Sequence, residues 1–170
     1  MKKLMMAAIG LMMAVSANAQ YLNDSGTPFE DGKFYVAASF SNTTLAYNKL
    51  SDLAIDINGK AGYFFIDNLM GIGVIGYKNE KKGDIAAAML GVGARWYFDK
   101  VGIYVGGIAA YVHQKEYGVS FDDFQPEVHG GYAFFLGGHV TLEPEVYYRH
   151  SFKDSDYSEI GARIGIGIYF

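Results

Sequence analysis

The chain ends in Glu159-Ile160-Gly161-Ala162-Arg163-Ile164-Gly165-Ile166-Gly167-Ile168-Tyr169-Phe170, where large apolar residues alternate with small or polar ones. Even-numbered positions carry Ile or Ala and end on Phe170, whereas odd-numbered positions carry Gly together with Glu159, Arg163 and Tyr169. Because successive side chains of a β-strand point to opposite faces, this period of two predicts a strand. One face of that strand is apolar, and the other is small or polar.

The same alternation recurs in five earlier stretches, which we also predict to be strands: 33–41, 53–65, 88–98, 124–134 and 140–149. Two more stretches, 69–77 and 101–113, are strand-like, but both of their faces are apolar or Gly. The orientation of these two strands therefore stays open. In total the pattern predicts eight strands.

The connections between the predicted strands alternate in length. Tight turns of the hairpin type are expected at Asp67-Asn68, Asp99-Lys100 and Gly137-Gly138. Longer polar loops are expected near 42–52, 78–84, 114–122 and 151–157. Tight turns at one end and long loops at the other are typical of membrane barrels.

The start of the chain has the features of an export signal. Two lysines precede an apolar run that ends at Val15, and Ala17-Asn18-Ala19 offers small residues for cleavage. No later stretch reaches the roughly 18 consecutive apolar residues that a transmembrane helix requires. We therefore expect a cleaved signal peptide, a flexible lead-in and one barrel domain, over residues 1–19, 20–32 and 33–170.

Composition excludes some classes of partner and site. Cleavage would leave 12 of the 14 basic residues against 18 acidic ones, a balance that argues against nucleic acid as a partner. The chain has no cysteine, so it folds without disulfides and offers no thiolate to a metal.

Two kinds of barrel, soluble and membrane-spanning, fit the alternation. They differ in whether the charged face points outward or inward. A soluble barrel that binds an apolar ligand encloses its apolar face, whereas a membrane barrel turns that face to lipid and encloses the polar one. In this chain the polar face is rich in Gly, Ala and Ser, which suits the crowded interior of a narrow barrel. We therefore predict an all-β fold, an eight-stranded antiparallel up-and-down transmembrane β-barrel, with the soluble barrel as the alternative.

Aromatic residues favour the membrane barrel, because such barrels carry aromatic girdles at both interfaces. One predicted girdle lies beside the tight turns and consists of Phe34, Tyr63, Phe65, Trp96, Phe98 and Phe134. A second set lies nearer the long loops and consists of Phe40, Tyr111, Phe124 and Tyr148. Between them, Val92 and Ile164 are expected to face lipid, where an Arg costs about 2–4 kcal/mol near the midplane. Gly93→Ser, on the inner face, is expected to be milder than such an Arg, with overpacking as its main risk.

Charged residues on the inner faces predict a network across the lumen, which consists of Asp56, Lys60, Arg95, Glu127, Glu143, Glu145, Arg149 and Arg163. Burying these charges singly would be costly, so we expect them to pair and to hydrogen-bond. Eight strands leave room for little beyond side chains, which favours a polar plug that fills the lumen. The alternative is a narrow channel for water or small solutes.

In this strand pattern, and most specifically in the closing strand from Ile160 to Phe170, the chain resembles the small eight-stranded outer-membrane β-barrel proteins, the OmpX- and OmpA-like group. The resemblance covers residues 32–170. It implies a bacterial outer-membrane location, contact with membrane lipid and lipopolysaccharide, and recognition of the terminal aromatic Phe170 by the barrel-assembly machinery. We expect a monomeric, non-enzymatic protein, structural or surface-exposed, with mobile extracellular loops.

Three patterns resemble other kinds of site but lack part of their geometry. Residues 71–76 spell a dinucleotide-binding glycine motif, yet they fall on a predicted strand and not at the start of a helix. His129 and His139 are expected to point inward near acidic residues, but the sequence defines no set of convergent zinc ligands. His150 and Ser151 are adjacent, whereas outer-membrane lipid A deacylases use a His-x-Ser spacing. We therefore predict no catalytic, cofactor-binding or metal-binding residues, and no cofactor.

Overall fold

A computed structural model describes residues 28–42, 54–80, 85–98 and 101–170. Its elements are β1 (Phe34–Asn42), β2 (Ala54–Ile66), β3 (Leu69–Glu80), β4 (Ile85–Tyr97), β5 (Ile103–Glu116), β6 (Val119–Tyr132), β7 (Phe134–Gly137), β8 (Val140–Arg149), a short 3-10 helix η2 (Ser155–Tyr157) and β9 (Glu159–Tyr169). The expected signal peptide, the first part of the lead-in and the Asp99-Lys100 turn lie outside the described residues. Within the described ranges, no helix is long and apolar enough to cross a membrane.

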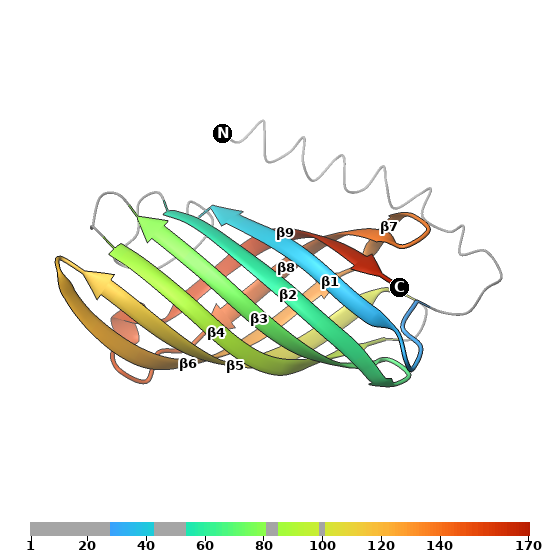
Figure 1. Cartoon of the computed structure of the whole chain (residues 1–170), viewed down its shortest axis with the longest axis horizontal. Helices are drawn as coiled ribbons and strands as arrows, with labels where there is room; N and C mark the ends of the chain where they lie inside the picture. The colour runs from blue at the N-terminus through green and yellow to red at the C-terminus, as the bar shows by residue number, and fades with distance from the viewer. Residues whose placement is uncertain (1–27, 43–53, 81–84, 99–100) are drawn as a thin grey trace.

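The strands form one closed antiparallel barrel (Figure 1). Strands β1 to β6 pair in sequence order, and β1 closes the barrel against β9, from Tyr35 opposite Tyr169 to Phe40 opposite Ile164. β6 and β7 act as one strand interrupted at Ala133, because both pair with β8. The nine segments therefore make eight barrel strands, and the predicted up-and-down barrel is confirmed.

Two of the predicted tight turns lie at the end of the barrel that also holds Phe170, which we call the terminal end (Figure 1). Between β2 and β3, Asn68 adopts a left-handed backbone conformation with φ 67°, and Gly138 between β7 and β8 has φ 51°. Both positions suit the short hairpin connections that the sequence predicted.

The opposite end, which we call the hairpin end, departs from the prediction. The long loop expected over 114–122 is wrong, because β5 runs to Glu116 and β6 begins at Val119. Tyr117 and Gly118, with φ 46° and 82°, make a two-residue turn whose conformation matches the twist of the flanking strands. The polar residues of this stretch belong to a β5–β6 hairpin that projects beyond its neighbours (Figure 1).

The apolar face of the barrel wall points outward and the polar face points inward, as predicted. Val92 and Ile164 point outward and are 67% and 41% exposed, whereas Arg95 and Arg163 are buried. A soluble barrel would show the reverse, so this arrangement contradicts that alternative.

The structure settles the orientation of the two strands that the sequence left open. β3 turns Met70, Ile72 and Val74 inward, and β5 turns Ile108 and Val112 inward. One wall of the interior is therefore apolar, and the charged side chains gather against it.

A layer of aromatic rings closes the lumen at the terminal end. Phe29, which is 1% exposed, stacks on Tyr97 with ring centroids 4.2 Å apart and meets Tyr169 edge-on at 5.6 Å. The Asn68 backbone amide donates to the Phe29 carbonyl oxygen at 2.7 Å. The described part of the predicted lead-in, residues 28–32, is thus packed against the barrel, which its composition did not predict.

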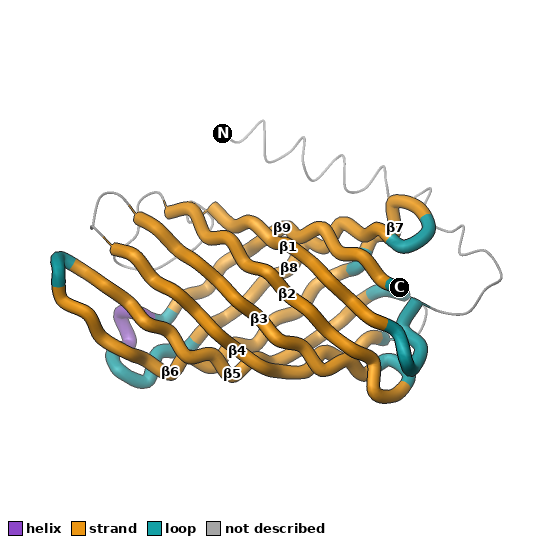
Figure 2. The backbone as a smooth tube through the Cα atoms, viewed as in Figure 1, coloured by secondary structure: helices purple, strands orange, loops and turns teal. Residues whose placement is uncertain are grey.

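The segment between β8 and β9, which contains η2, packs against the β5–β6 hairpin at the other end (Figure 2). Tyr157 contacts the ring of Phe121 and donates from its hydroxyl to Glu116 at 3.1 Å. The Ser151 hydroxyl donates to the Asp123 carboxylate at 2.5 Å. These partners occupy inward positions of the hairpin, so the segment covers the lumen on this side.

At several glycines of the inner face, neighbouring atoms occupy the space that a side chain would need. A Cβ added to Gly93 would lie 2.0 Å from the Gly107 carbonyl oxygen, and one on Gly131 would lie 2.6 Å from that of Pro144. Backbone atoms cannot rotate away from such a contact. The expectation that overpacking is the main risk of Gly93→Ser fits this geometry, and its cost relative to that of an Arg on the lipid-facing side stays a prediction.

We predict that Gly93→Ala lowers the free energy of unfolding by about 1–3 kcal/mol, the usual cost of overpacking. The matched control is Gly73→Ala on the outward face, where the nearest atom to the new Cβ is the Ala61 carbonyl oxygen at 4.0 Å. Urea titration of the folded barrel in phospholipid vesicles, followed by gel mobility, measures both. Equal urea unfolding midpoints for the two variants would show that the backbone around Gly93 can shift to accommodate the added methyl group, which would contradict the prediction.

Candidate functional site

Seven of the eight charged residues predicted for the lumen come together in its middle, and we call them the lumen network. They come from five strands, and each is at most 7% exposed: Lys60 on β2, Arg95 on β4, Glu127 on β6, Glu143, Glu145 and Arg149 on β8, and Arg163 on β9. The side chain of the eighth, Asp56, lies outside the described part of the structure.

Glu145 and Arg163 stand at the centre of the lumen network. They are directly opposite each other on β8 and β9, and the Arg163 guanidinium bonds both Glu145 and Glu127. Lys60 Nζ lies 3.0 Å from both carboxylate oxygens of Glu145, and Arg149 Nη2 lies 2.7 Å from Glu127 Oε2. Each carboxylate oxygen of these two glutamates therefore has a cationic partner.

Arg95 links this centre to the aromatic layer at the terminal end. Its side chain is 0% exposed, with Nη2 3.0 Å from Glu145 Oε2 and Nη1 3.1 Å from Glu143 Oε2. The guanidinium carbon lies 4.0 Å from the centroid of the Tyr104 ring, close enough for a cation–π contact. One buried cation thus contacts two glutamates and an aromatic face.

Tyrosine hydroxyls complete the lumen network, and the sequence analysis missed them. Tyr35 and Tyr169 donate to Glu143 at 2.6 and 2.9 Å, and Tyr104 donates to Glu145 at 3.0 Å. The prediction looked for aromatic residues only at lipid-facing interfaces. For Tyr35 and Tyr169 the available signal was strand parity, because both fall on inward positions of strands that the sequence could orient. Tyr104 lies on β5, whose orientation the sequence left open.

Known proteins match this chain through structure and not through sequence. No protein-family model matches it, and no curated protein sequence matches it. Neisserial surface protein A aligns over 86% of this chain and 100% of its own, with a TM-score of 0.62 and 14% identity. The N-terminal β-barrel domain of Pseudomonas aeruginosa OprF aligns over 82% and 98%, with a TM-score of 0.61 and 13% identity. The Yersinia pestis outer membrane protein Ail in a phospholipid bilayer nanodisc aligns over 82% and 100%, with a TM-score of 0.56 and 13% identity.

The chain has the fold of the small eight-stranded outer-membrane β-barrels. This confirms the predicted fold class, a closed eight-stranded antiparallel up-and-down β-barrel. At these identities the likeness concerns the fold alone.

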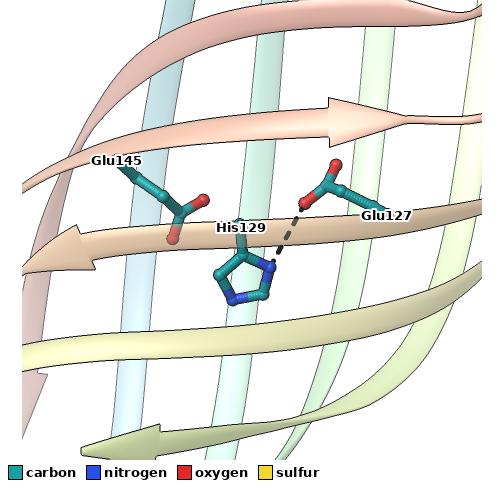
Figure 3. Close-up of side chains that lie close together, drawn as sticks. All are labelled: Glu127, His129 and Glu145. Atoms are coloured by element: carbon teal, nitrogen blue, oxygen red, sulfur yellow. Dashed lines mark ion pairs between the residues drawn. The ribbon is translucent and has the colours of Figure 1, made fainter. Parts of the chain in front are cut away.

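Glu127, His129 and Glu145 form the one group in the described residues whose side chains approach the pattern of a metal site (Figure 3). Their possible ligand atoms lie within 4.8 Å of one another, and His129 Nδ1 is 3.5 Å from Glu127 Oε1. Tetrahedral zinc with bonds of about 2.0–2.2 Å needs its ligands closer together. Arg163 already joins the two carboxylates where such an ion would sit, so the residues do not fit a metal.

The other residues considered for metal or hydrolase chemistry are not assembled. His139, expected to point inward, is exposed, so that expectation is wrong. Ser158 Oγ lies 3.4 Å from His150 Nδ1, but the Glu159 carboxylate is bound by Lys78 at 2.7 Å and by Tyr147. Ser, His and acid therefore do not form a triad here.

The six residues predicted for the girdle beside the tight turns lie on the outward face near the terminal end. Phe34, Phe65, Trp96 and Phe98 are at least 43% exposed, and Tyr63 and Phe134 are partly exposed. Phe170 is 58% exposed and stacks on Phe34 with centroids 6.0 Å apart. Their roles at a membrane interface and in insertion stay predictions.

A double-mutant cycle with Glu145→Gln and Arg163→Gln should show strong coupling. Removing either charge leaves its buried partners unbalanced, at a cost of about 3–5 kcal/mol when the pair is fully desolvated. The matched control is the exposed pair His113–Asp122, 2.7 Å apart with side chains 56% and 54% exposed, where coupling of about 0–1 kcal/mol is expected. Urea unfolding measures both cycles, and equally weak coupling in both would mean that water reaches the lumen network.

Proposed function

We propose that this protein is a non-enzymatic outer-membrane barrel, structural or surface-exposed, whose lumen is a solid charged core and not a passage. The lumen network carries the proposal. Arg163 joins β9 to β8 and β6, Arg95 joins β4 to β8, and Lys60 joins β2 to β8. Ion pairs that cross the lumen from several strands stabilise the closed barrel and occupy the space that a channel would need.

The packing around the lumen network supports a plug. Gaps between Tyr35, Lys60, Tyr104, Glu145 and Arg163 are too narrow to hold a water molecule. The aromatic layer at the terminal end and the segment around η2 at the hairpin end lie on either side of this core. A solute that crossed the described part of the barrel would have to break several desolvated charge pairs, each of which is costly to separate.

We infer that the terminal end faces the periplasm and the hairpin end faces outward from a bacterial cell. The expected signal peptide and the tight turns at the terminal end support this orientation. The exposed ring of Phe170 is accessible for recognition by the barrel-assembly machinery, as the family resemblance implies. The apolar outer wall suits membrane lipid and lipopolysaccharide.

We infer a monomer, because closure of β1 on β9 pairs the two strands that would otherwise be edges.

Recording from a planar bilayer tests the plug against a narrow channel. The full chain, inserted and shown to be folded by its heat-modifiable gel mobility, is expected to add no steady conductance. A large porin in the same bilayer serves as the positive control for detection. Discrete, stable conductance steps from the folded chain would overturn the plug and support a channel for water or small solutes.

The lipid-facing assignment predicts that Val92→Arg and Ile164→Arg each cost about 2–4 kcal/mol if they lie near the bilayer midplane. The control is Val119→Arg, the first residue of β6 after the β5–β6 turn, which is 68% exposed in the hairpin that projects beyond its neighbours (Figure 1). Unfolding in phospholipid vesicles measures all three. A loss at Val119 as large as at Val92 would contradict the assignment of inside and outside.

A further inference from the structure

The imidazole of His129 lies inside the barrel without a hydrogen bond. Its side chain is 0% exposed, and within the described part of the chain neither ring nitrogen has a hydrogen-bond partner. The ring lies beside Glu127 of its own strand and Glu145 of β8, but Nδ1 is 3.5 Å from Glu127 Oε1, too far for a hydrogen bond (Figure 3). A buried polar group in this state costs free energy. The interior therefore keeps a basic nitrogen that no hydrogen bond uses.

The acceptors nearest the ring are already bound by other residues. Arg163 bonds both Glu127 and Glu145. Lys60 Nζ also lies 3.0 Å from both carboxylate oxygens of Glu145. The second ring nitrogen, Nε2, packs against Gly106 of β5, where an added Cβ would lie 2.5 Å from it. The neutral imidazole, which has one donor and one acceptor, thus stays outside the ion pairs that surround it.

Positive charge already exceeds negative charge among the described groups around His129. The cations are Lys60 on β2, Arg95 on β4, Arg149 on β8 and Arg163 on β9, and the carboxylates are Glu127 on β6 with Glu143 and Glu145 on β8. The other titratable groups that face the ring are phenols, namely Tyr104 on β5, with ring centroids 6.3 Å apart, and the register partner Tyr147 on β8. A proton on His129 would therefore add a fifth cation against three carboxylates.

We propose that His129 is a proton-binding switch that loosens the lumen network in acid. The imidazolium has two N–H donors. Its Nδ1–H turns to Glu127 Oε1, the oxygen that Arg163 Nη2 bonds in the closed barrel, and competes with that ion pair. Because Arg163 links β9 to β6, this competition weakens a link across the lumen. The inference rests on the proposed function, since a water-filled lumen would solvate the added charge and leave the ion pairs undisturbed.

A pH titration of the full chain, uniformly labelled with nitrogen-15 and folded in phospholipid bilayers, tests the switch by NMR from pH 7.5 to 4.5. The His129 ring is expected to be neutral at pH 7.5 and to gain a second N–H proton on acidification. The Arg163 guanidinium signals are expected to shift with the same midpoint. In His129→Asn, which keeps a polar side chain but takes up no proton, the Arg163 signals should stay constant. The matched control is His113→Asn, at a ring that is 56% exposed and paired with Asp122, and the Arg163 shift should persist there.

Stability gives a second measure of the same proton. The unfolded chain binds it below the ordinary imidazole pKa of about 6.5, whereas the packed, cation-rich interior resists it, so stability falls as the pH falls. One proton amounts to tenfold per pH unit below that value. Between pH 7.5 and 5.0 the folding equilibrium constant of the parent is expected to fall by up to about thirtyfold relative to that of His129→Asn. Urea unfolding in vesicles measures both, and His129→Gln replaces His129→Asn if the latter folds poorly.

Three results would overturn the switch: a His129 ring that stays neutral to pH 4.5, Arg163 signals that do not follow the ring, or equal pH dependences of unfolding for the parent and the His129 variants. Each of these leaves the closed lumen of the proposed function standing. Steady conductance of the folded parent at pH 7.5 would instead sink the proposed function itself.

Discussion

The structure depends on full pairing of the buried Glu145 carboxylate inside a narrow membrane barrel. Alternation along each strand sends every second side chain inward, and an interior enclosed by eight strands must be filled by those side chains alone. A charge placed there is costly unless it is fully paired. Glu145 is paired with Arg163, Lys60 and Arg95 and accepts a hydrogen bond from Tyr104, so that residues from β2, β4, β5 and β9 converge on one group of β8.

This pairing also specifies the register of the barrel. Glu145 and Arg163 are directly opposite on neighbouring strands, and a slip of one residue would turn one of them toward lipid. The bulky interior in turn requires glycine at facing positions. A Cβ on Gly167 would lie 2.5 Å from Glu143 Oε1, and one on Gly161 would lie 2.7 Å from the Tyr147 hydroxyl. The large polar side chains of the interior therefore fit only because the facing positions are glycine.

The period of two was sufficient to predict the barrel and the inward direction of the charged residues, and the turn-forming residues predicted the tight turns at Asn68 and Gly138. It could not orient β3 and β5, because Ile72 and Ile75 on opposite faces of β3 are equally apolar. It also mistook residues 114–122 for a loop, since a strand that projects into solvent has the same polar composition as a loop. The place of Phe29 inside the terminal end depends on contacts between segments far apart in the chain, which no local pattern records.

The interior is a packed ionic core closed to water, and arginine side chains report on it selectively. The chain has three arginines, Arg95, Arg149 and Arg163, and all three belong to the lumen network. Uniform nitrogen-15 labelling of the folded chain in phospholipid bilayers, followed by transfer to D2O, measures how fast water reaches the arginine guanidinium protons and the backbone amides in one sample. The account predicts that the signals of Arg95 and Arg163 persist long after exposed backbone amides at the β5–β6 turn have exchanged. Loss of all three arginine signals as quickly as those amides would contradict it and show a water-filled lumen.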